Sequence, residues 1–202
     1  LLEEPQAAFY AWLHTRADDW RKMLKIDDCV LVVDIGGGTT DFSLIGVAQE
    51  EGNLTLKRLA VGAHLLLGGD NIDLSLAYLA KDKLEEKGQA IDDWQMQSLV
   101  HSCRKAKERL LSDAPPNEVE ITLLGRGSRL IGGSLKVKIT LKEARDLILD
   151  GFAPIVPIEE RSKAEKRAGL QQIGLPYAQD ARLTCQLAKF LSMTGESDAE
   201  GI

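Results

Sequence analysis

The residues best suited to chemistry form one glycine-rich run, Asp34-Ile35-Gly36-Gly37-Gly38-Thr39-Thr40-Asp41. Glycines have no Cβ, so backbone N–H groups can approach a ligand closely and positive φ is allowed. Successive amides in a tight turn form a concavity that binds anions. Thr39 and Thr40 add hydroxyl donors, and the carboxylate of Asp34 can hold a magnesium ion, usually through its waters. The run therefore predicts a site for a metal–polyphosphate complex.

Two familiar phosphate motifs do not fit this run. A Walker A loop requires Gly-Lys-Ser/Thr leading into a helix, and no lysine is present in residues 34–41. A dinucleotide fingerprint opens a helix, whereas the pattern here predicts a strand after the glycines. A glycine hairpin with no ligand is the plain alternative. The flanking Asp34, Thr39, Thr40 and Asp41 favour the phosphate site over it.

Strands are predicted on both sides of the glycines. Residues 29–33 are a short, continuous apolar run rich in β-branched side chains, which predicts a strand buried on both faces. Residues 41–47 and 54–61 predict a second and a third strand. Because the turns between them are short and contain glycine, we expect the three strands to form a meander.

A helix is predicted before this meander, over residues 6–24, with Pro5 at its start, where the missing N–H costs nothing. Ala8, Trp12 and Leu13 would form its packed face. After the meander, Gly68-Gly69 precede further predicted helices and strands. A helix is predicted over residues 70–87 and ends at Gly88, and a second helix is predicted over 92–111. Short strands follow between 118 and 139, and then a helix over 141–149, which begins at the capping box of Thr140 and Glu143 and ends at Gly151. The remaining segments are a charged stretch over 159–167, a helix over 180–191 and a frayed end over 197–202.

The composition allows a real core, and the predicted strands and helices together indicate an α/β fold. The 202 residues are 44% hydrophobic, which suits one large domain or two small subdomains. No apolar run approaches the roughly 20 residues that span a bilayer, and no signal peptide opens the chain, so no membrane partner is expected. A net charge of -6 argues against nucleic acid as a partner. Three widely spaced cysteines argue against disulfides or a zinc site and favour a reducing, cytoplasmic compartment.

The glycine run resembles the second phosphate loop of the seventy-kilodalton heat-shock chaperones (DnaK type), which belong to the actin–hexokinase ATPase superfamily. That loop reads Asp-Leu-Gly-Gly-Gly-Thr-Phe-Asp, with Ile35 and Thr40 as the departures here. Upstream, the family has Asn-Glu-Pro-Thr-Ala-Ala at a helix start, and residues 3–8 read Glu-Glu-Pro-Gln-Ala-Ala. The family glutamate orders magnesium and the attacking water, so the resemblance implies this role for Glu4 and makes Glu4 and Asp34 the catalytic, magnesium-holding pair.

Two further family motifs follow. Residues 62–73 are similar to the family motif Gly-Asp-Thr-His-Leu-Gly-Gly-Glu-Asp-Phe-Asp, with two residues inserted and Asp70 in place of glutamate. Gly68 and Gly69 would bring a helix N-terminus toward the phosphates. The nucleoside-contacting helix, Cys-Glu-Arg-Ala-Lys-Arg-x-Leu-Ser, is similar to residues 103–112.

In that nucleoside-contacting helix, Lys107 matches a lysine that reaches the ribose. Arg104 replaces a ribose-contacting glutamate, Glu108 replaces an arginine that stacks on the base, and Leu111 falls where the family has serine. A solvated basic helix face is the alternative interpretation of these positions.

The resemblance covers residues 3–154 and implies the second lobe of an actin-like (ribonuclease H-like) ATPase domain, with ATP and magnesium as cofactors. Residues 1–67 would carry the phosphate hairpin with part of a split sheet, residues 68–152 would form a helical and β subdomain, and residues 153–202 a divergent C-terminal segment. The chain starts at Leu1 without methionine, as a piece of a longer protein would.

The first lobe of the domain, with its own phosphate loop and catalytic lysine, is absent from the sequence and would be the main partner. The lobe alone should therefore bind ATP weakly and not hydrolyse it efficiently. Clients and co-chaperones would act through the parent protein. A small-molecule kinase lobe and an actin-like filament protein remain alternatives, and the helical insertion over residues 70–111 favours the chaperone.

Overall fold

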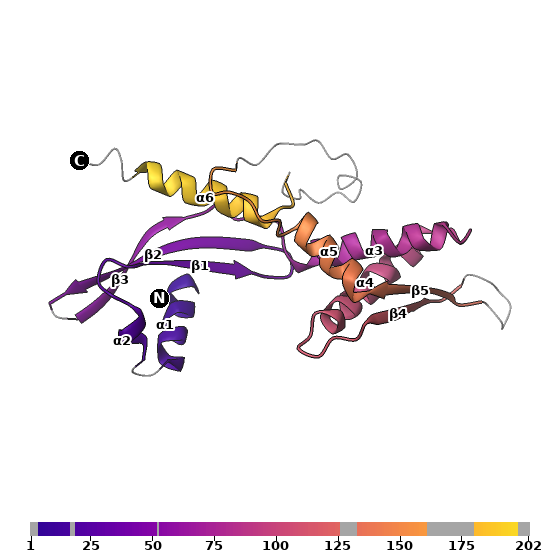
Figure 1. The fold of residues 1–202 in the computed structure, drawn as a ribbon, viewed down its shortest axis with the longest axis horizontal. Coiled ribbons are helices and arrows are strands. Elements are labelled where there is room, and N and C mark those ends of the chain that lie inside the picture. Colours follow the sequence, from indigo (N-terminus) through magenta and orange to yellow (C-terminus); the bar gives the residue numbers. More distant parts are fainter. Residues whose placement is uncertain (1–3, 17–18, 52, 126–132, 161–179, 198–202) are drawn as a thin grey trace.

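The computed structural model describes residues 4–16, 19–51, 53–125, 133–160 and 180–197. It is a mixed α/β structure with two small antiparallel sheets at the two ends of an elongated shape (Figure 1). Within the described residues, no helix has the length and apolar character needed to cross a membrane. In chain order the elements are α1 (Glu4–Thr15), α2 (Trp20–Met23), β1 (Cys29–Ile35), β2 (Thr40–Glu50), β3 (Asn53–Val61), α3 (Gly69–Glu85), α4 (Asp93–Leu110), β4 (Glu118–Leu123), β5 (Leu135–Thr140), α5 (Leu141–Gly151) and α6 (Leu183–Ser197).

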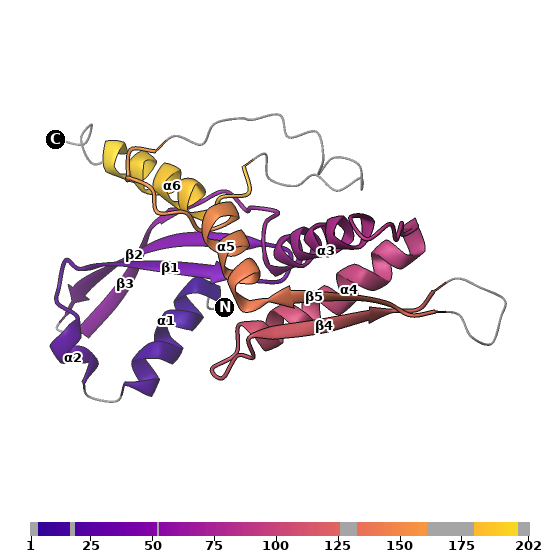
Figure 2. The ribbon, with the colours of Figure 1, turned by 45° about the vertical axis from the view of Figure 1, so that its right-hand side comes forward.

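The first sheet is the predicted meander, with strand order β1-β2-β3 and antiparallel pairing throughout. Side chains alternate between its two faces. Val30, Val32 and Ile45 lie on the face that packs against α1, around buried Phe9. Phe42, on the opposite face, stacks on Phe190 of α6 with ring centroids 5.8 Å apart. The sheet is thus covered by α1 on one side and α6 on the other, as both ribbon views show (Figures 1 and 2).

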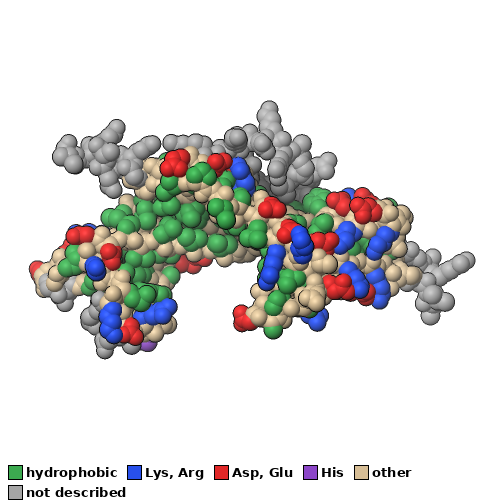
Figure 3. Space-filling model, viewed as in Figure 1, with side chains coloured by type: hydrophobic (Ala, Val, Ile, Leu, Met, Phe, Trp, Pro, Cys, Tyr) green, Lys and Arg blue, Asp and Glu red, His purple; other side chains and the backbone are tan. Residues whose placement is uncertain are grey.

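Strand β1 is not buried on both faces, so that prediction is wrong. It is the edge strand of the described sheet, and Val33 and Ile35 are 41% and 55% exposed. Hydrophobic side chains gather on the surface over this sheet, whereas charged side chains gather over the other end of the molecule (Figure 3). Val30, Leu31 and Val32 are half-buried, whereas Val33 is exposed. On the face away from α1, helix α6 stacks on the neighbouring strand β2.

The helix predicted over residues 6–24 is broken into α1 and α2. The hydroxyl of Thr15 donates to the Trp12 carbonyl at 2.7 Å, and the Arg16 amide is shared between the carbonyls of Trp12 and Leu13. Such bonds are typical of a helix end. The packed face is also shifted from the prediction: Ala8 is exposed, and Phe9 takes its place beside Trp12, with the two rings 5.8 Å apart.

The second part of the chain packs α3, α4 and α5 against the two-stranded sheet of β4 and β5. The predicted capping box of α5 is confirmed, since Thr140 accepts from the Glu143 amide. Helix α4 also has an N-cap, Asp92, which accepts from the Gln95 amide. Gly88, with φ of 74°, ends the turn after α3 as expected. The buried core of this part consists of Leu76, Ala77, Ala80, Leu84, Leu99, Cys103, Ala106, Leu110, Ile121, Leu123, Val137, Ile139 and Ala144.

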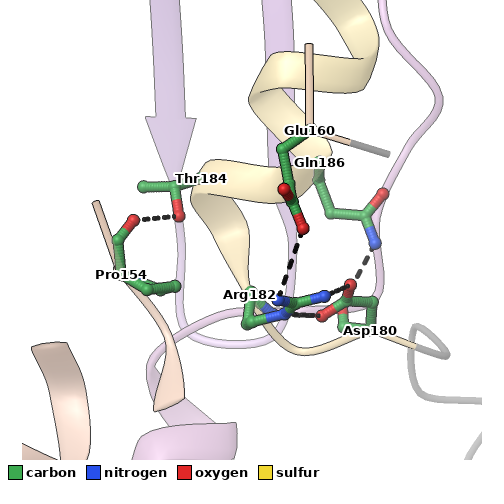
Figure 4. A network of polar contacts seen from close by, with 6 residues as sticks. All are labelled: Pro154, Glu160, Asp180, Arg182, Thr184 and Gln186. Carbon is green, nitrogen blue, oxygen red and sulfur yellow. Dashed lines mark hydrogen bonds and ion pairs between the residues drawn. The ribbon is translucent and has the colours of Figure 1, made fainter. Parts of the chain in front are cut away.

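Helix α6 begins three residues later than predicted, because Asp180 binds the backbone and side chain of Arg182 ahead of the helix. The Asp180 carboxylate accepts from the Arg182 amide at 3.0 Å and pairs with its guanidinium at 2.9 and 2.8 Å (Figure 4). The hydroxyl of Thr184 donates to the Pro154 carbonyl, which ties α6 to the segment leaving α5. The predicted charged segment beyond Glu160 and the frayed end beyond Ser197 lie outside the described residues.

Candidate functional site

The glycine run forms the bend between β1 and β2, as predicted. Ile35 pairs with Thr40 across the strands, and the Gly36 amide closes the bend by donating to the Thr39 carbonyl at 2.8 Å. In the described part of the chain, no hydrogen bond uses the amides of Gly37, Gly38 or Thr39. Three successive N–H groups on an exposed bend are therefore available to an anion.

The N-terminus of α3 is joined to this bend. The Gly69 amide donates to the Gly36 carbonyl at 3.0 Å, and the Asp70 amide donates to the Gly37 carbonyl at 2.7 Å. The first amides of a helix have no partner within it, so the bend satisfies two of them. A Cβ on Gly68 would lie 2.6 Å from both carbonyl oxygens, which is why only glycine fits there.

Gly68 and Gly69 thus reach the bend, as the sequence predicted, but their amides are engaged within the protein. The Gly68 amide donates to the Asn71 side chain at 2.8 Å, and the Gly69 amide is used by the bend. In this structure the Gly69 amide holds the bend in place, and the phosphate contact stays a prediction.

Thr40 is fully buried, which corrects the prediction that its hydroxyl is a phosphate donor. The hydroxyl donates to the Leu67 carbonyl at 2.7 Å, and Thr40 also exchanges backbone hydrogen bonds with Leu65. This pairing brings the loop before α3 alongside the start of β2. The residues inserted relative to the family motif lie in this loop, where Leu67 is buried. Thr39 stays half-buried on the bend.

Two acidic residues are paired across the strands at the mouth of the hairpin. Asp34 and Asp41 are directly opposite in the β1–β2 register, an arrangement that is unfavourable for like charges without a cation nearby. His64 Nδ1 lies 2.8 Å from Asp41 Oδ1. A third carboxylate, that of Asp70, has an oxygen 3.5 Å from where a Cβ would stand on Gly37. The sequence alone did not connect His64 to this site; its place directly after Gly62-Ala63 in the family motif was the available signal.

The described residues contain no group of three or more His, Cys, Asp or Glu side chains arranged to hold a metal ion. Magnesium usually keeps several waters and binds through one or two carboxylates plus the phosphates of a ligand. The opposed pair of Asp34 and Asp41 beside three unused amides fits that mode of binding.

Glu4 lies in the first turn of α1 and is exposed. Helix α1 packs on the face of the sheet that holds Val30 and Val32, and alternation places Asp34 on that same face. The structure thus puts both predicted catalytic carboxylates on one side of the sheet. No hydrogen bond joins them among the described contacts.

Lys107 lies against the first turn of α3. Its Nζ donates to the Gly69 carbonyl at 2.8 Å and lies 2.8 Å from Asp73 Oδ1, and the two side chains are only 15% and 4% exposed. Burial raises the pKa of Asp73, and Lys107 opposes that rise. Burial, helped by Asp73, raises the pKa of the nearby Cys103 thiol to about 12, so this thiol is not a nucleophile at neutral pH.

Asp73 was missed by sequence reasoning. It stands three residues before Leu76, on the apolar face of the predicted helix, and a carboxylate on such a face was the signal that could have found it. Arg104 and Glu108, by contrast, pair with each other at 3.2 Å and are 60% and 61% exposed. Their position fits the solvated helix face that the sequence left open as an alternative. Leu111 is exposed at the end of α4.

Comparison with protein-family models gives a match to the family described as Hsp70 protein, over residues 2–156. This range is most of the chain. It contains the bend, the first turn of α3 and Lys107, and it ends before α6.

Proposed function

Since the chain belongs to the Hsp70 family of nucleotide-binding chaperone ATPases, we propose that it supplies the phosphate-binding half of a two-lobed ATP site. In this proposal, residues 1–67 correspond to the phosphate-hairpin subdomain of the second lobe of an actin-like domain. Residues 68–152 correspond to its helical and β subdomain, and residues 153–202 to a divergent segment. The two separate apolar clusters, one under α1 and one between α3, α4 and the second sheet, support this division.

The observation that carries the proposal is the set of unused amides on the bend. Gly37, Gly38 and Thr39 offer three N–H groups, while the carbonyls of Gly36 and Gly37 are held by α3. Donors fixed before a ligand arrives cost no reorganisation when the phosphate charge is bound. Because glycine lines the bend, the ligand can approach the backbone closely.

The carboxylates beside the bend suit magnesium. When bound with ATP, magnesium neutralises charge on the phosphates. With magnesium and ATP bound, Asp34 would accept hydrogen bonds from waters of the ion, and Glu4 would orient the water that attacks the terminal phosphate. Asp41 is kept in position by its 2.8 Å contact with His64.

The nucleoside would meet α4. An ammonium group has three donors. Lys107 donates one to the Gly69 carbonyl and forms an ion pair with Asp73, so a further donor could reach a ribose hydroxyl. Arg104 and Glu108 would contribute contacts from the exposed side of the helix. Since these two side chains already pair in solvent, we propose that they add little affinity.

The other half of the site would come from the first lobe of the domain, which is the partner implied by this proposal. Phosphoryl transfer depends on positioning from both sides of the phosphates, so the 202-residue chain alone should bind Mg-ATP with millimolar affinity or weaker. In the full-length protein, slow hydrolysis would drive lobe closure and signal to a neighbouring domain, through which clients and co-chaperones act.

A titration of the 15N-labelled chain with Mg-ATP tests the proposal. We expect the amide resonances of Gly37, Gly38 and Thr39 to move the most, and to move less in the Asp34→Asn variant. Asp150→Asn, at the exposed end of α5, is the matched control and should behave as the wild type. Shifts confined to other regions would contradict the phosphate assignment, and micromolar affinity in calorimetry would contradict the half-site.

A further inference from the structure

We propose that Asp73 is a positioning residue for the phosphate bend, acting through Lys107 and the first turn of α3. The inference rests on the proposed function, because that function makes the bend a ligand site. Asp73 is 4% exposed and does not itself reach the bend; its partner is the ammonium of Lys107, 2.8 Å away.

The contacts form one continuous path. Lys107 on α4 donates to the Gly69 carbonyl, and Gly69 and Asp73 stand four residues apart, on one face of α3. One ammonium therefore holds both a backbone and a side-chain group of the same helical turn. On the other side of that turn, the Gly69 amide donates to the Gly36 carbonyl, which belongs to the bend.

The turn has little room to move between these two partners. A Cβ on Gly69 would lie 3.1 Å from Lys107 Nζ, and a Cβ on Gly68 would lie 2.6 Å from the carbonyl oxygens of Gly36 and Gly37. A shift of Lys107 therefore moves the start of α3, and with it the two hydrogen bonds that fix the bend.

Stability alone does not account for the buried pair. Replacing a buried ion pair by apolar side chains is often neutral or stabilising, whereas removing one partner is costly. A buried pair that joins α4 to α3 where α3 meets the bend is suited to fixing geometry. The same helix carries a second pair, Lys83 with Glu143 at 2.7 Å, which is more exposed and joins α3 to α5 away from the bend. It provides a natural control.

The test uses amide hydrogen exchange of the chain without ligand, followed by the Mg-ATP titration. In Asp73→Asn, we expect exchange of the Gly69 and Asp70 amides to accelerate roughly tenfold, which corresponds to a loss of about 1.4 kcal/mol in local opening. The isosteric control Glu143→Gln should accelerate these two amides by no more than its effect on global unfolding accounts for. Equal acceleration in both variants would overturn the proposal, since it would reflect a general loosening of α3.

A double variant, Asp73→Leu with Lys107→Met, separates positioning from stability and serves if Asp73→Asn does not fold. We expect it to unfold at about the wild-type urea concentration but to exchange the Gly69 and Asp70 amides faster. Wild-type exchange in this variant would overturn the proposal. The exchange experiment does not depend on nucleotide binding. If Mg-ATP fails to move the bend resonances of the wild type, the proposed function is wrong, but the exchange data still decide the role of Asp73.

Discussion

The amide of Asp70 donates a 2.7 Å hydrogen bond to the carbonyl of Gly37, so the start of α3 is bonded to the tip of the hairpin. The neighbouring bond from Gly69 to Gly36 makes the attachment two-pronged. Because α3 bonds to the carbonyls of the bend, the amides of the bend stay available to a ligand. This division of the backbone groups is the physical basis of the site, and several substitutions can test it.

Gly68→Ala should push the bend away from α3, because the added Cβ would stand 2.6 Å from the carbonyl oxygens of Gly36 and Gly37. Forced overpacking against backbone costs about 1–3 kcal/mol, which urea unfolding would measure. The Mg-ATP shifts of the bend amides should also shrink. Gly151→Ala is the control, since its Cβ would meet nothing within 4 Å. Equal unfolding midpoints for the two variants would show that the close approach is not constraining.

Thr40→Val should destabilise the protein without touching a ligand contact. It leaves the buried Leu67 carbonyl without the hydroxyl that donates to it, a loss of about 1–3 kcal/mol in the free energy of unfolding. Thr122→Val, at an exposed position of β4, should change it by no more than about 0.5 kcal/mol. The Mg-ATP titration, under conditions where both variants are folded, should give wild-type shifts of the bend amides. A Thr40 variant that keeps its stability but loses nucleotide would restore the role first predicted for its hydroxyl.

Glu143→Gln should lower the stability of the protein at neutral pH but not in acid. Burial favours the neutral acid, but hydrogen bonds from Lys83 and Thr140 outweigh it and lower the pKa of Glu143 below its usual 4.5. A lowered folded-state pKa means that the contribution to stability is complete above the unfolded value and is lost as pH falls through the folded one. The free energy of unfolding of the wild type should therefore exceed that of Glu143→Gln by roughly 0.5–1 kcal/mol at neutral pH. Urea unfolding should find the difference in the free energy of unfolding shrinking as pH falls below 4.5; a gap that widens in acid would contradict the assignment.

Local signals predicted most of the fold. The meander, the stop at Gly88 and the capping box of Thr140 with Glu143 each depend on residues a few positions apart, and each is confirmed. The burial of β1 could not be predicted in the same way. Whether Val33 is covered depends on which strand α6 meets, and that is decided by the contact of Phe190 with Phe42.

The bend of the candidate site could be predicted from the sequence, but the contacts that hold the bend in place could be predicted only in part. A glycine run with flanking carboxylates and hydroxyls identified residues 36–39 directly. Thr40 could not be separated from Thr39 by residue type, because only the pairing with Leu65 turns one of the two inward. The ion pair of Asp73 with Lys107 joins two helices across a long sequence separation. A carboxylate on the apolar face of the predicted helix could mark Asp73, but no local pattern identified its partner.

The proposed roles of the two carboxylates make a last prediction for the full-length protein. Asp34→Asn should lower the rate of ATP hydrolysis by on the order of 10–100-fold, the effect of losing a group that orders the water around a metal. Glu4→Gln should reduce turnover to a similar extent but leave nucleotide affinity nearly unchanged, because its partner would be the attacking water rather than the bound phosphates. Steady-state turnover and equilibrium binding, with Asp150→Asn as control, separate these effects. Normal turnover in Asp34→Asn would remove that residue from the mechanism, and weakened binding in Glu4→Gln would move Glu4 from the water to the nucleotide.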